Sequence, residues 1–364
     1  MSMISFARGV PAPECLPVEA LAECAKAAIE RDGRTILSYG TGGGYGPLRE
    51  WIAARHGVTP GRVMLTNGSL QGFVFLATHF FGGNQTGRVL VEAPTYDRPL
   101  KILAENGADI VALPMDDEGL DPDALEAALK KGPKPAFVYS IPTFQNPSGR
   151  TLSTERRTRI AEIVREHEVL FLEDDPYGLI RYEGAVQPSL FELEGGKHVA
   201  YSSSFSKTVA PGVRVGYFIF PEAVGKQIEA IAVSNYISPV MLSQATVFEF
   251  CNRGLFEPNL ERVTGLLGAR RDAMLESLER ELAGSGCSWS HPEGGYFLWL
   301  DFPEGVDCAE LLPRAEAAGV TFVKGTDFFP ANGGGRNAAR LAFSFVSTDE
   351  IRDGVAKLAA LIKG

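Results

Sequence analysis

Cysteine is scarce in this sequence, and its few residues form no recognisable pattern. Cys15, Cys24, Cys251, Cys287 and Cys308 are odd in number and far apart, no C-x-x-C occurs, and the five histidines do not cluster. We therefore expect neither a disulfide framework nor a structural zinc site, and we predict no metal. The simplest interpretation is a reduced, cytoplasmic protein.

Long apolar runs and basic runs are also missing. No stretch approaches the ~18–20 consecutive apolar residues of a transmembrane helix. The start, MSMISFARGVPAPE, lacks a basic segment followed by an apolar one, so we expect no secretory signal. Lys and Arg number 35 against 45 Asp and Glu, a formal net charge of −10. Such a chain is a poor candidate for binding nucleic acid or an anionic membrane, although a few cations can dominate within one concave site.

The length and composition are those of a globular protein. At ~150 residues per domain, the 364 residues suggest about two domains. Apolar residues make up 45% and charged residues 22%, which excludes a mostly disordered chain. Glycine is frequent, with 40 residues, and because the glycines are scattered they indicate tight turns rather than a linker.

Short apolar runs alternate with helical patterns between residues 62 and 220. The runs are apolar on both faces, as buried parallel strands are. They are RVMLT (62–66), RVLVE (88–92), DIVALP (109–114), AFVYSI (136–141), VLFLED (169–174), HVAYSS (198–203) and VGYFIF (215–220). Helical patterns between them include residues 95–106, 121–131 and 153–167. The alternation predicts an α/β domain in which a mostly parallel sheet of seven strands lies between helices.

After about residue 222 the pattern changes. The chain is then mostly helical to residue 285, with breaks near Ser238-Pro239 and Pro258. Strand-like runs and a final helix follow, at 296–302, 320–325, 339–345 and 348–362. They predict a smaller C-terminal α/β domain over 251–364, beside a large domain over 41–250. Residues 1–40 carry no strong strand signal, and we expect them to pack on the small domain or on a partner.

Polar and aromatic residues gather just after the predicted strands, where open α/β sheets bind ligands. TNGSLQG (66–72) puts small residues at a helix start, whose free N–H groups and dipole suit a phosphate. EAPTYDRP (92–99) places Tyr96 where its ring could stack on a flat ligand. QNPSG (145–149) is a turn that contains Asn146. Taken singly, an ordinary turn or a core tyrosine explains each of them at least equally well.

Two further segments contain acidic and basic residues that could bind or react with a ligand. EDDPYG (173–178) ends a buried strand with three acids, so we expect one to face a cation, with a solvated loop as the alternative. YSSSFSKTVAPGVRVGY (201–217) puts Lys207 in a Ser-rich turn, seven residues before Arg214. A desolvated lysine there can be a nucleophile, and the alternative is a surface lysine.

The phosphate turn, the stacking aromatic, the strand-end acid and the lysine are together the parts that hold pyridoxal 5′-phosphate. The lysine forms a Schiff base with the aldehyde, and the acid keeps the pyridine nitrogen protonated.

On these motifs the sequence resembles the fold type I pyridoxal-phosphate enzymes of the class I/II aminotransferases. It is most similar to the branch of kynurenine/α-aminoadipate aminotransferases, lysine-biosynthesis aminotransferases and the enzyme-like part of MocR regulators. The resemblance runs from ISFARGVPAPE (4–14) to ARLAFSF (339–345), with NPSGRTLS, EDDPYG and SSFSKTVAPGVRVGY in the family's order. It implies an aspartate-aminotransferase-like fold.

The resemblance implies roles for the matching residues. Lys207 corresponds to the Schiff-base lysine, whose amine also moves a proton between Cα and the cofactor. Asp174 fits the partner of the pyridinium nitrogen, three residues before Tyr177, and Asp175 is the second choice. Tyr177 and Asn146 would hydrogen-bond the ring oxygen.

Further cofactor contacts are implied as well. Tyr96 would stack on the ring. The phosphate would be held by small polar residues, a backbone amide and an arginine: Ser69, the Leu70 amide, Ser204, Ser206 and Arg214. Relatives often have a polar residue at the position of Leu70, so a side-chain contact is lost there.

Other matches concern the substrate and a second subunit. Tyr39, in LSYGTGGGYG, matches the tyrosine that reaches the neighbouring subunit's phosphate, which implies a homodimer with shared active sites. Arg340 matches the arginine that pairs with the substrate α-carboxylate, and Asn146 and Gly40 are further predicted substrate contacts. Arg8 lies near where related enzymes close over the substrate, and its role stays open.

The predicted function is an aminotransferase that moves an amine from an amino acid to a 2-oxo acid in a ping-pong cycle. A pyridoxal-phosphate lyase or decarboxylase on the same fold is the alternative. A ligand-sensing module of a MocR-type regulator would need an N-terminal DNA-binding domain, whereas this chain starts about where the enzyme domain starts. No single residue predicts which amino acid is the donor.

Overall fold

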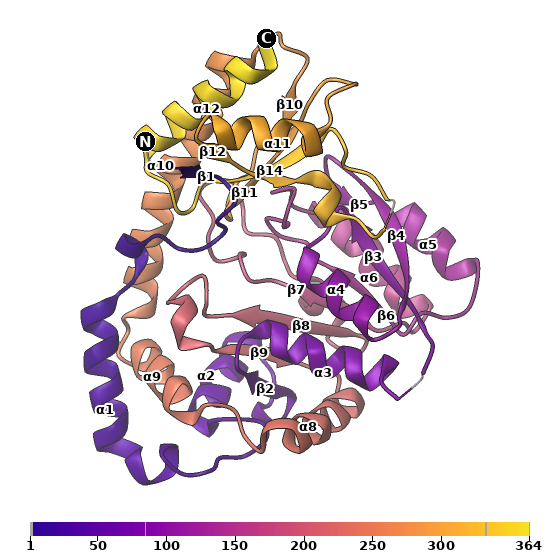
Figure 1. The fold of residues 1–364 in the computed structure, drawn as a ribbon. Helices are drawn as coiled ribbons and strands as arrows, with labels where there is room; N and C mark the ends of the chain where they lie inside the picture. The colour runs from indigo at the N-terminus through magenta and orange to yellow at the C-terminus, as the bar shows by residue number, and fades with distance from the viewer. Residues whose placement is uncertain (1–2, 84, 332, 364) are drawn as a thin grey trace.

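The largest sheet organises the fold (Figure 1). A computed structural model describes residues 3–83, 85–331 and 333–363, and within them this sheet has eight strands in the order β2-β9-β8-β7-β6-β3-β4-β5. The strands are β2 (Val63–Thr66), β3 (Arg88–Ala93), β4 (Asp109–Asp116), β5 (Gly119–Leu120), β6 (Phe137–Ser140), β7 (Phe171–Asp174), β8 (Val199–Ser204) and β9 (Gly216–Ile219).

All the runs predicted between residues 62 and 220 form strands of this sheet. β4, β3, β6, β7 and β8 pair in parallel, whereas β9 is antiparallel to β8 and β2. The structure adds β5, a two-residue strand in a hairpin with β4, which is too short for an apolar pattern. The predicted α/β fold with a mostly parallel sheet is confirmed.

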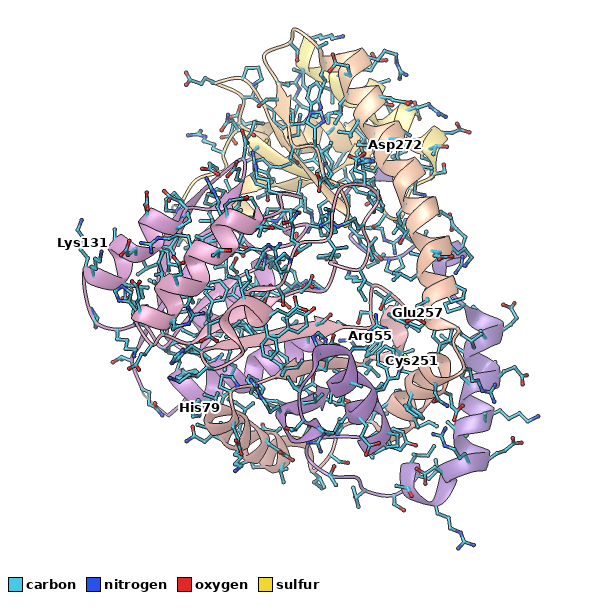
Figure 2. All side chains as sticks on the ribbon, turned by 180° about the vertical axis from the view of Figure 1, so that it is seen from behind. Arg55, His79, Lys131, Cys251, Glu257 and Asp272 are labelled. Carbon is cyan, nitrogen blue, oxygen red and sulfur yellow. The ribbon has the colours of Figure 1, made fainter. Side chains whose placement is uncertain are left out.

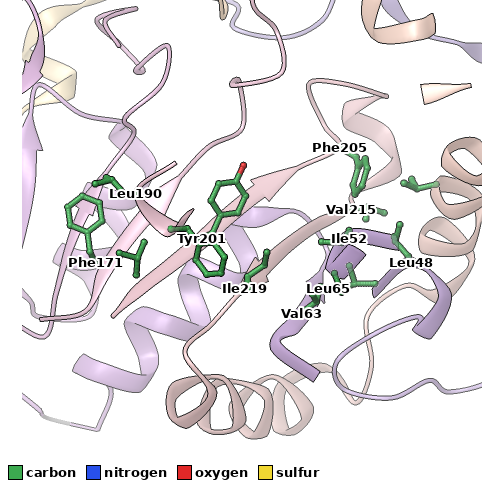
Figure 3. Packing of buried hydrophobic residues seen from close by; sticks show 14 of the residues in the cluster. Leu48, Ile52, Val63, Leu65, Phe171, Leu190, Tyr201, Phe205, Val215 and Ile219 are labelled. Atoms are coloured by element: carbon green, nitrogen blue, oxygen red, sulfur yellow. The ribbon is translucent and has the colours of Figure 1, made fainter. Parts of the chain in front are cut away.

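Alternate residues of each strand lie on opposite faces of the sheet, as the two-residue period requires. Phe171 packs in one hydrophobic cluster with Val63 and Ile219 (Figure 3), and Leu172 packs in another with Phe73. The first face is covered by α2 (Gly46–His56), α5 (Pro122–Lys130), α6 (Thr154–Glu166), α7 (Leu190–Glu194) and α9 (Met241–Asn252). The second is covered by α3 (Ser69–Phe81), α4 (Asp97–Glu105) and α8 (Glu222–Tyr236).

A smaller antiparallel sheet follows in the C-terminal part of the chain, in the order β10-β11-β14-β13. Its strands are β10 (Ser288–Trp289), β11 (Phe297–Asp301), β13 (Val323–Lys324) and β14 (Ala338–Ala342). Its apolar side packs against α10 (Phe256–Leu282), α11 (Cys308–Ala317) and α12 (Thr348–Lys363). Short 3-10 helices complete the elements: η1 (Pro13–Cys15), η2 (Pro60–Arg62), η3 (Pro211–Val213) and η4 (Gly325–Phe328).

The long helix α10 connects the two sheets. At its start Glu257 forms an ion pair with Arg55 of α2 at 2.9 Å, and Asp272 lies farther along the helix (Figure 2). The chain breaks between α8 and α9 at Ser238-Pro239, as predicted. The second predicted break is misplaced: it falls at 253–255, and Pro258 lies in the first turn of α10, where a missing N–H is tolerated.

The first forty residues contact both parts of the molecule. β1 (Ile4–Ser5) pairs in parallel with β12 (Val320–Thr321) beside the small sheet. α1 (Val18–Ile36) packs against α9. Among the helices that the structure describes, none combines the length and apolar content that a membrane crossing requires.

Candidate active site

A cavity of about 650 Å³ opens where the carboxyl ends of the large sheet meet the small sheet and the N-terminal segment. It is lined by most of the residues selected from the sequence: Ser69, Leu70, Tyr96, Asn146, Asp174, Tyr177, Ser204, Ser206, Lys207, Arg214 and Arg340. Turns that follow different parallel strands converge here because parallel strands end at the same edge of a sheet.

Lys207 lies in the turn between β8 and β9. Its Nζ donates a hydrogen bond to the carbonyl oxygen of Gly9 at 2.9 Å and lies 5.1 Å from the centroid of the Tyr296 ring. Burial, followed by the charges of Arg340 and Arg214, lowers the pKa of this amine to about 8. About a tenth of the amine is therefore neutral at pH 7, far more than for an ordinary lysine, and the neutral amine is the nucleophilic form.

The first of the three acids at the end of β7 is a structural group. Glu173 is buried and accepts the backbone N–H groups of Leu190 at 3.1 Å and Phe191 at 2.8 Å, at the start of α7. Arg157 lies 3.7 Å from it. Burial raises the pKa of Glu173 to about 7. These contacts hold α6 and α7 to the sheet, away from the cavity.

The other two acids, Asp174 and Asp175, differ in whether both oxygens of the carboxylate have a hydrogen-bond partner. Asp175 accepts the Gly178 N–H at 2.7 Å through Oδ1 and the Tyr201 hydroxyl at 2.8 Å through Oδ2. Asp174 accepts the Tyr139 hydroxyl at 3.0 Å through Oδ2, but its Oδ1 is shielded from solvent and has no partner among the described residues. Burial raises the pKa of Asp174 to about 6, although the hydroxyls of Tyr139 and, to a smaller extent, Ser202 lower it in part. Asp174 lines the cavity and has an oxygen free for a cationic partner, which Asp175 lacks.

Arg340 lies within β14 and is 8% exposed. Its Nη1 donates to Oδ1 of Asn146 at 3.1 Å and its Nη2 to the carbonyl oxygen of Ala7 at 2.9 Å, whereas Nε has no partner among the described residues. The guanidinium lies 4.3 Å from the centroid of the Phe297 ring. Burial lowers the pKa of Arg340 to about 10, so it is a cation at neutral pH. A buried cation bonded to neutral oxygens fits an incoming carboxylate.

Backbone N–H groups and an arginine meet at the start of α3. Gly68, the N-cap, has a φ of +88°, and a Cβ there would collide with the guanidinium of Arg214. Arg214 Nη1 donates to Oγ of Ser206 at 3.3 Å, and the Ser206 N–H donates to Oγ of Ser204 at 3.1 Å. The first turn of α3, which starts at Ser69, leaves N–H groups without helical partners. These residues, Gly68, Ser69, Ser204, Ser206 and Arg214, form a corner that suits a phosphate group, and we call it the phosphate corner.

Two tyrosines contribute aromatic surface to the cavity. Tyr96 caps α4, and burial raises its pKa to about 12. The Tyr177 ring lies 5.3 Å from that of Tyr296, centroid to centroid, and burial raises the pKa of Tyr177 well above its usual value. Both phenols therefore stay protonated at neutral pH and can donate hydrogen bonds.

Besides Asp175, three residues considered in the sequence analysis do not line this cavity. Tyr39 is 84% exposed, and the Gly40 N–H donates to Oγ of Ser238 at 3.1 Å. The guanidinium of Arg8 lies 4.3 Å from the centroid of the Phe345 ring. The predicted roles of Tyr39 and Gly40 would need a second copy of the chain.

The structure also adds residues that sequence reasoning missed. They come from the N-terminal segment, from α4 and from the small-sheet side: Ala7, Gly9, Asp97, Arg98, Lys101, Phe297, Val323, Asp327 and Phe328. Of these, only the residues of α4 could have been found from the sequence. Helical spacing puts Lys101 one turn after Asp97, so both lie close to Tyr96. The others reach the cavity through packing between distant segments.

Three comparisons relate the chain to known proteins. The family described as Aminotransferase class I and II matches residues 3–357. The chain is 37% identical to aromatic-amino-acid aminotransferase 1 of Thermococcus litoralis, over 99% of this chain and 88% of that protein. It is also 37% identical to 2-aminoadipate transaminase of Thermus thermophilus, over 100% and 90%. The crystal structure of α-aminoadipate aminotransferase from Thermus thermophilus, complexed with N-(5′-phosphopyridoxyl)-L-leucine, matches with a TM-score of 0.93 and 36% identity, over 99% of this chain and 92% of that chain.

Proposed function

Because this chain belongs to the class I and II aminotransferases, we propose that its cavity binds pyridoxal 5′-phosphate and that Lys207 holds it. The chain is an amino-acid aminotransferase, and the predicted family and enzyme class are confirmed. The phosphopyridoxyl group in the Thermus thermophilus structure supports the same cofactor here.

The observation that carries this proposal is Oδ1 of Asp174, which has no hydrogen-bond partner among the residues that the structure describes. A buried carboxylate oxygen without a donor is unfavourable unless a ligand supplies one. The protonated nitrogen of a pyridine ring is such a donor. Lys207 and the phosphate corner line the same cavity, so the residues present fit the three reactive parts of the cofactor: its aldehyde, its ring nitrogen and its phosphate.

When bound, the cofactor supplies a ring that accepts the electron pair released at the Cα of the amino acid. Lys207 would take the Cα proton at Nζ and deliver it to the cofactor, and in the second half-reaction it would carry a proton back to the Cα of the oxo acid. Asp174 would keep the ring nitrogen protonated, and Tyr96 would stack on the ring. Asn146 already accepts from Arg340 through Oδ1, so its Nδ2 is left to donate to the ring oxygen, together with the Tyr177 hydroxyl.

The phosphate is bound by the corner at the start of α3. Its ligands are the Ser69 hydroxyl, the Leu70 amide, the hydroxyls of Ser204 and Ser206, and the Arg214 guanidinium. Gly68 supports this assignment, because only a residue without a Cβ leaves room for Arg214 beside the N–H groups.

Arg340 binds the α-carboxylate of the amino acid and then of the 2-oxo acid. Its free Nε and the Nη2 that now bonds the Ala7 carbonyl form the two-pronged donor that a carboxylate needs. Since the donor and the acceptor both carry this group, one arginine serves both halves of a ping-pong cycle.

We also propose a homodimer in which Tyr39 reaches the phosphate of the partner subunit. Tyr39 is exposed, as are Leu37, Ile237 and Val240, and the bond from the Gly40 N–H to Ser238 brings the two segments that carry them together into one surface. This surface adjoins the phosphate corner, since the Val240 N–H donates to Oδ1 of Asn67, whose carbonyl oxygen accepts from Arg214. Sedimentation should give a dimer, and mixing Tyr39→Phe with Lys207→Ala chains should restore activity through hybrid dimers. A fully active monomer would contradict the proposal.

A cytoplasmic location is part of the proposal as well. The five cysteines support it, since all are free thiols and four of them are buried.

The decisive experiment for the site is borohydride reduction of the protein saturated with pyridoxal phosphate, followed by peptide mapping. The cofactor should become attached to the peptide that contains Lys207, and attachment elsewhere or none at all would refute the assignment. A panel of amino donors with 2-oxoglutarate and pyruvate, read by mass spectrometry, then identifies the substrates. Decarboxylated or eliminated products would favour the lyase alternative.

A further inference from the structure

Tyr139 lies behind the cavity, in the middle of the large sheet. It pairs with Leu172 across β6 and β7, so the two-residue period puts it on the same face as Asp174. It is fully buried, and the Phe73 ring packs edge-on against it with centroids 5.3 Å apart. Its hydroxyl donates to Oδ2 of Asp174 at 3.0 Å. A phenylalanine would fill this volume equally well, so the hydroxyl is there for its hydrogen bond.

Building on the proposed function, we propose that Tyr139 is a positioning residue for Asp174. By holding Oδ2, the tyrosine leaves Oδ1 as the one carboxylate oxygen available to the cofactor's ring nitrogen. The same bond stabilises the charged carboxylate over the neutral acid, because it is donated to the ionised form. Tyr139 thus keeps the proton on the ring nitrogen rather than on Asp174, without touching the cofactor.

The chain contains a matched control for this idea. Tyr201 donates to Oδ2 of Asp175 at 2.8 Å, so the neighbouring acid has the same kind of partner in the adjacent strand. Asp175 does not line the cavity, and its Oδ1 is already bonded to the Gly178 N–H. Tyr201→Phe therefore removes an equivalent buried hydroxyl without affecting the proposed contact.

The first test measures cofactor affinity of the apoprotein by titration with pyridoxal phosphate. Tyr139→Phe should bind it up to about 10-fold more weakly, because the pKa of Asp174 rises when the hydroxyl is lost and one pKa unit corresponds to a factor of ten. Tyr201→Phe should stay within about twofold of the wild type. Circular dichroism and thermal unfolding of both apoproteins establish that they fold. In an Asp174→Ala background, Tyr139→Phe should have no further effect on affinity, because the tyrosine acts through the acid.

The second test measures the protonation state of the cofactor's ring nitrogen by NMR. With ¹⁵N-labelled pyridoxal phosphate, the ring resonance of Tyr139→Phe should shift toward the unprotonated position, and that of Tyr201→Phe should match the wild type. Unchanged affinity and resonance in Tyr139→Phe would overturn the inference, as would equal changes in both variants. If the wild-type apoprotein binds no cofactor, the proposed function itself fails; if it binds normally and only Tyr139→Phe is without effect, this inference alone fails.

Discussion

The large-sheet side and the small-sheet side of the cavity, which we call its two walls, differ in how their residues are brought into place. On the large-sheet side, Asn146, Asp174 and Lys207 lie at or within a few residues of the ends of β6, β7 and β8. On the small-sheet side, Arg340 lies inside β14, in the segment ARLAFSF, and Phe328 lies in η4, outside every motif. Parallel strand ends converge by themselves, whereas the second wall depends on how α10 and the N-terminal segment set the small sheet against the large one. The residues proposed to bind the cofactor are therefore placed by local sequence, and those proposed to bind the substrate are placed by packing.

The largest expected effect lies on the large-sheet wall. Lys207→Ala removes the amine that binds the cofactor and moves the proton, and we expect activity to fall by at least ~10⁴-fold. Lys207→Arg should lose as much, since it keeps the charge but offers no neutral amine. Steady-state kinetics with the best donor measure both. Substantial residual activity in either variant would move the chemistry to another group.

The two neighbouring acids should differ sharply. Asp174→Ala should lower the rate by ~10³-fold, ~4 kcal/mol, because the ring nitrogen loses its partner. Asp175→Ala should chiefly lower the thermal stability, since the Tyr201 hydroxyl and the Gly178 N–H lose their acceptor, at about 1–3 kcal/mol for each buried group. A mild effect at Asp174 with a severe rate effect at Asp175 would reverse the assignment.

A substitution on the small-sheet side that keeps the positive charge should affect substrates and leave the cofactor spectrum unchanged. Arg340→Lys loses the two parallel hydrogen bonds to a carboxylate, and we expect both half-reactions to slow roughly 10-fold to 100-fold with an unchanged cofactor spectrum. Arg336→Lys is the control, because Arg336 is exposed and pairs with Asp307. Near-normal stopped-flow rates for folded Arg340→Lys with both substrates would end its proposed role.

The smallest expected effect is that of the Arg340 charge, on the small-sheet side, on the pKa of Lys207, on the large-sheet side. The rate at which apoprotein combines with pyridoxal phosphate should rise with pH through a midpoint near 8 and level off about one pH unit higher, because Lys207 is half neutral at its pKa of about 8. Arg340 contributes to the lowered pKa, so Arg340→Gln should move the midpoint upward by a fraction of a unit. A wild-type midpoint near the ordinary lysine value would show that the amine is not desolvated.

Much of the large-sheet wall could be predicted because each part has a local pattern. Buried parallel strands are apolar on both faces, and their ends carry the few polar residues that folding tolerates there. The misplaced break near Pro258 and the missed strand β5 arose where the pattern is short or ambiguous. Tyr139 could not be told from an ordinary core residue, since its significance lies in a carboxylate 35 positions away.

By itself, the sequence determined the element order, the strand ends that carry the lysine, the acid and the phosphate turn, and the family. These features depend on local periodicity and on residues that are neighbours along the chain. Only the tertiary structure decided which of the three acids keeps a free oxygen, that the carbonyl groups of Ala7 and Gly9 meet Arg340 and Lys207, and which small-sheet residues complete the cavity. Those contacts join segments far apart in the chain, and only burial and packing against each other select their partners.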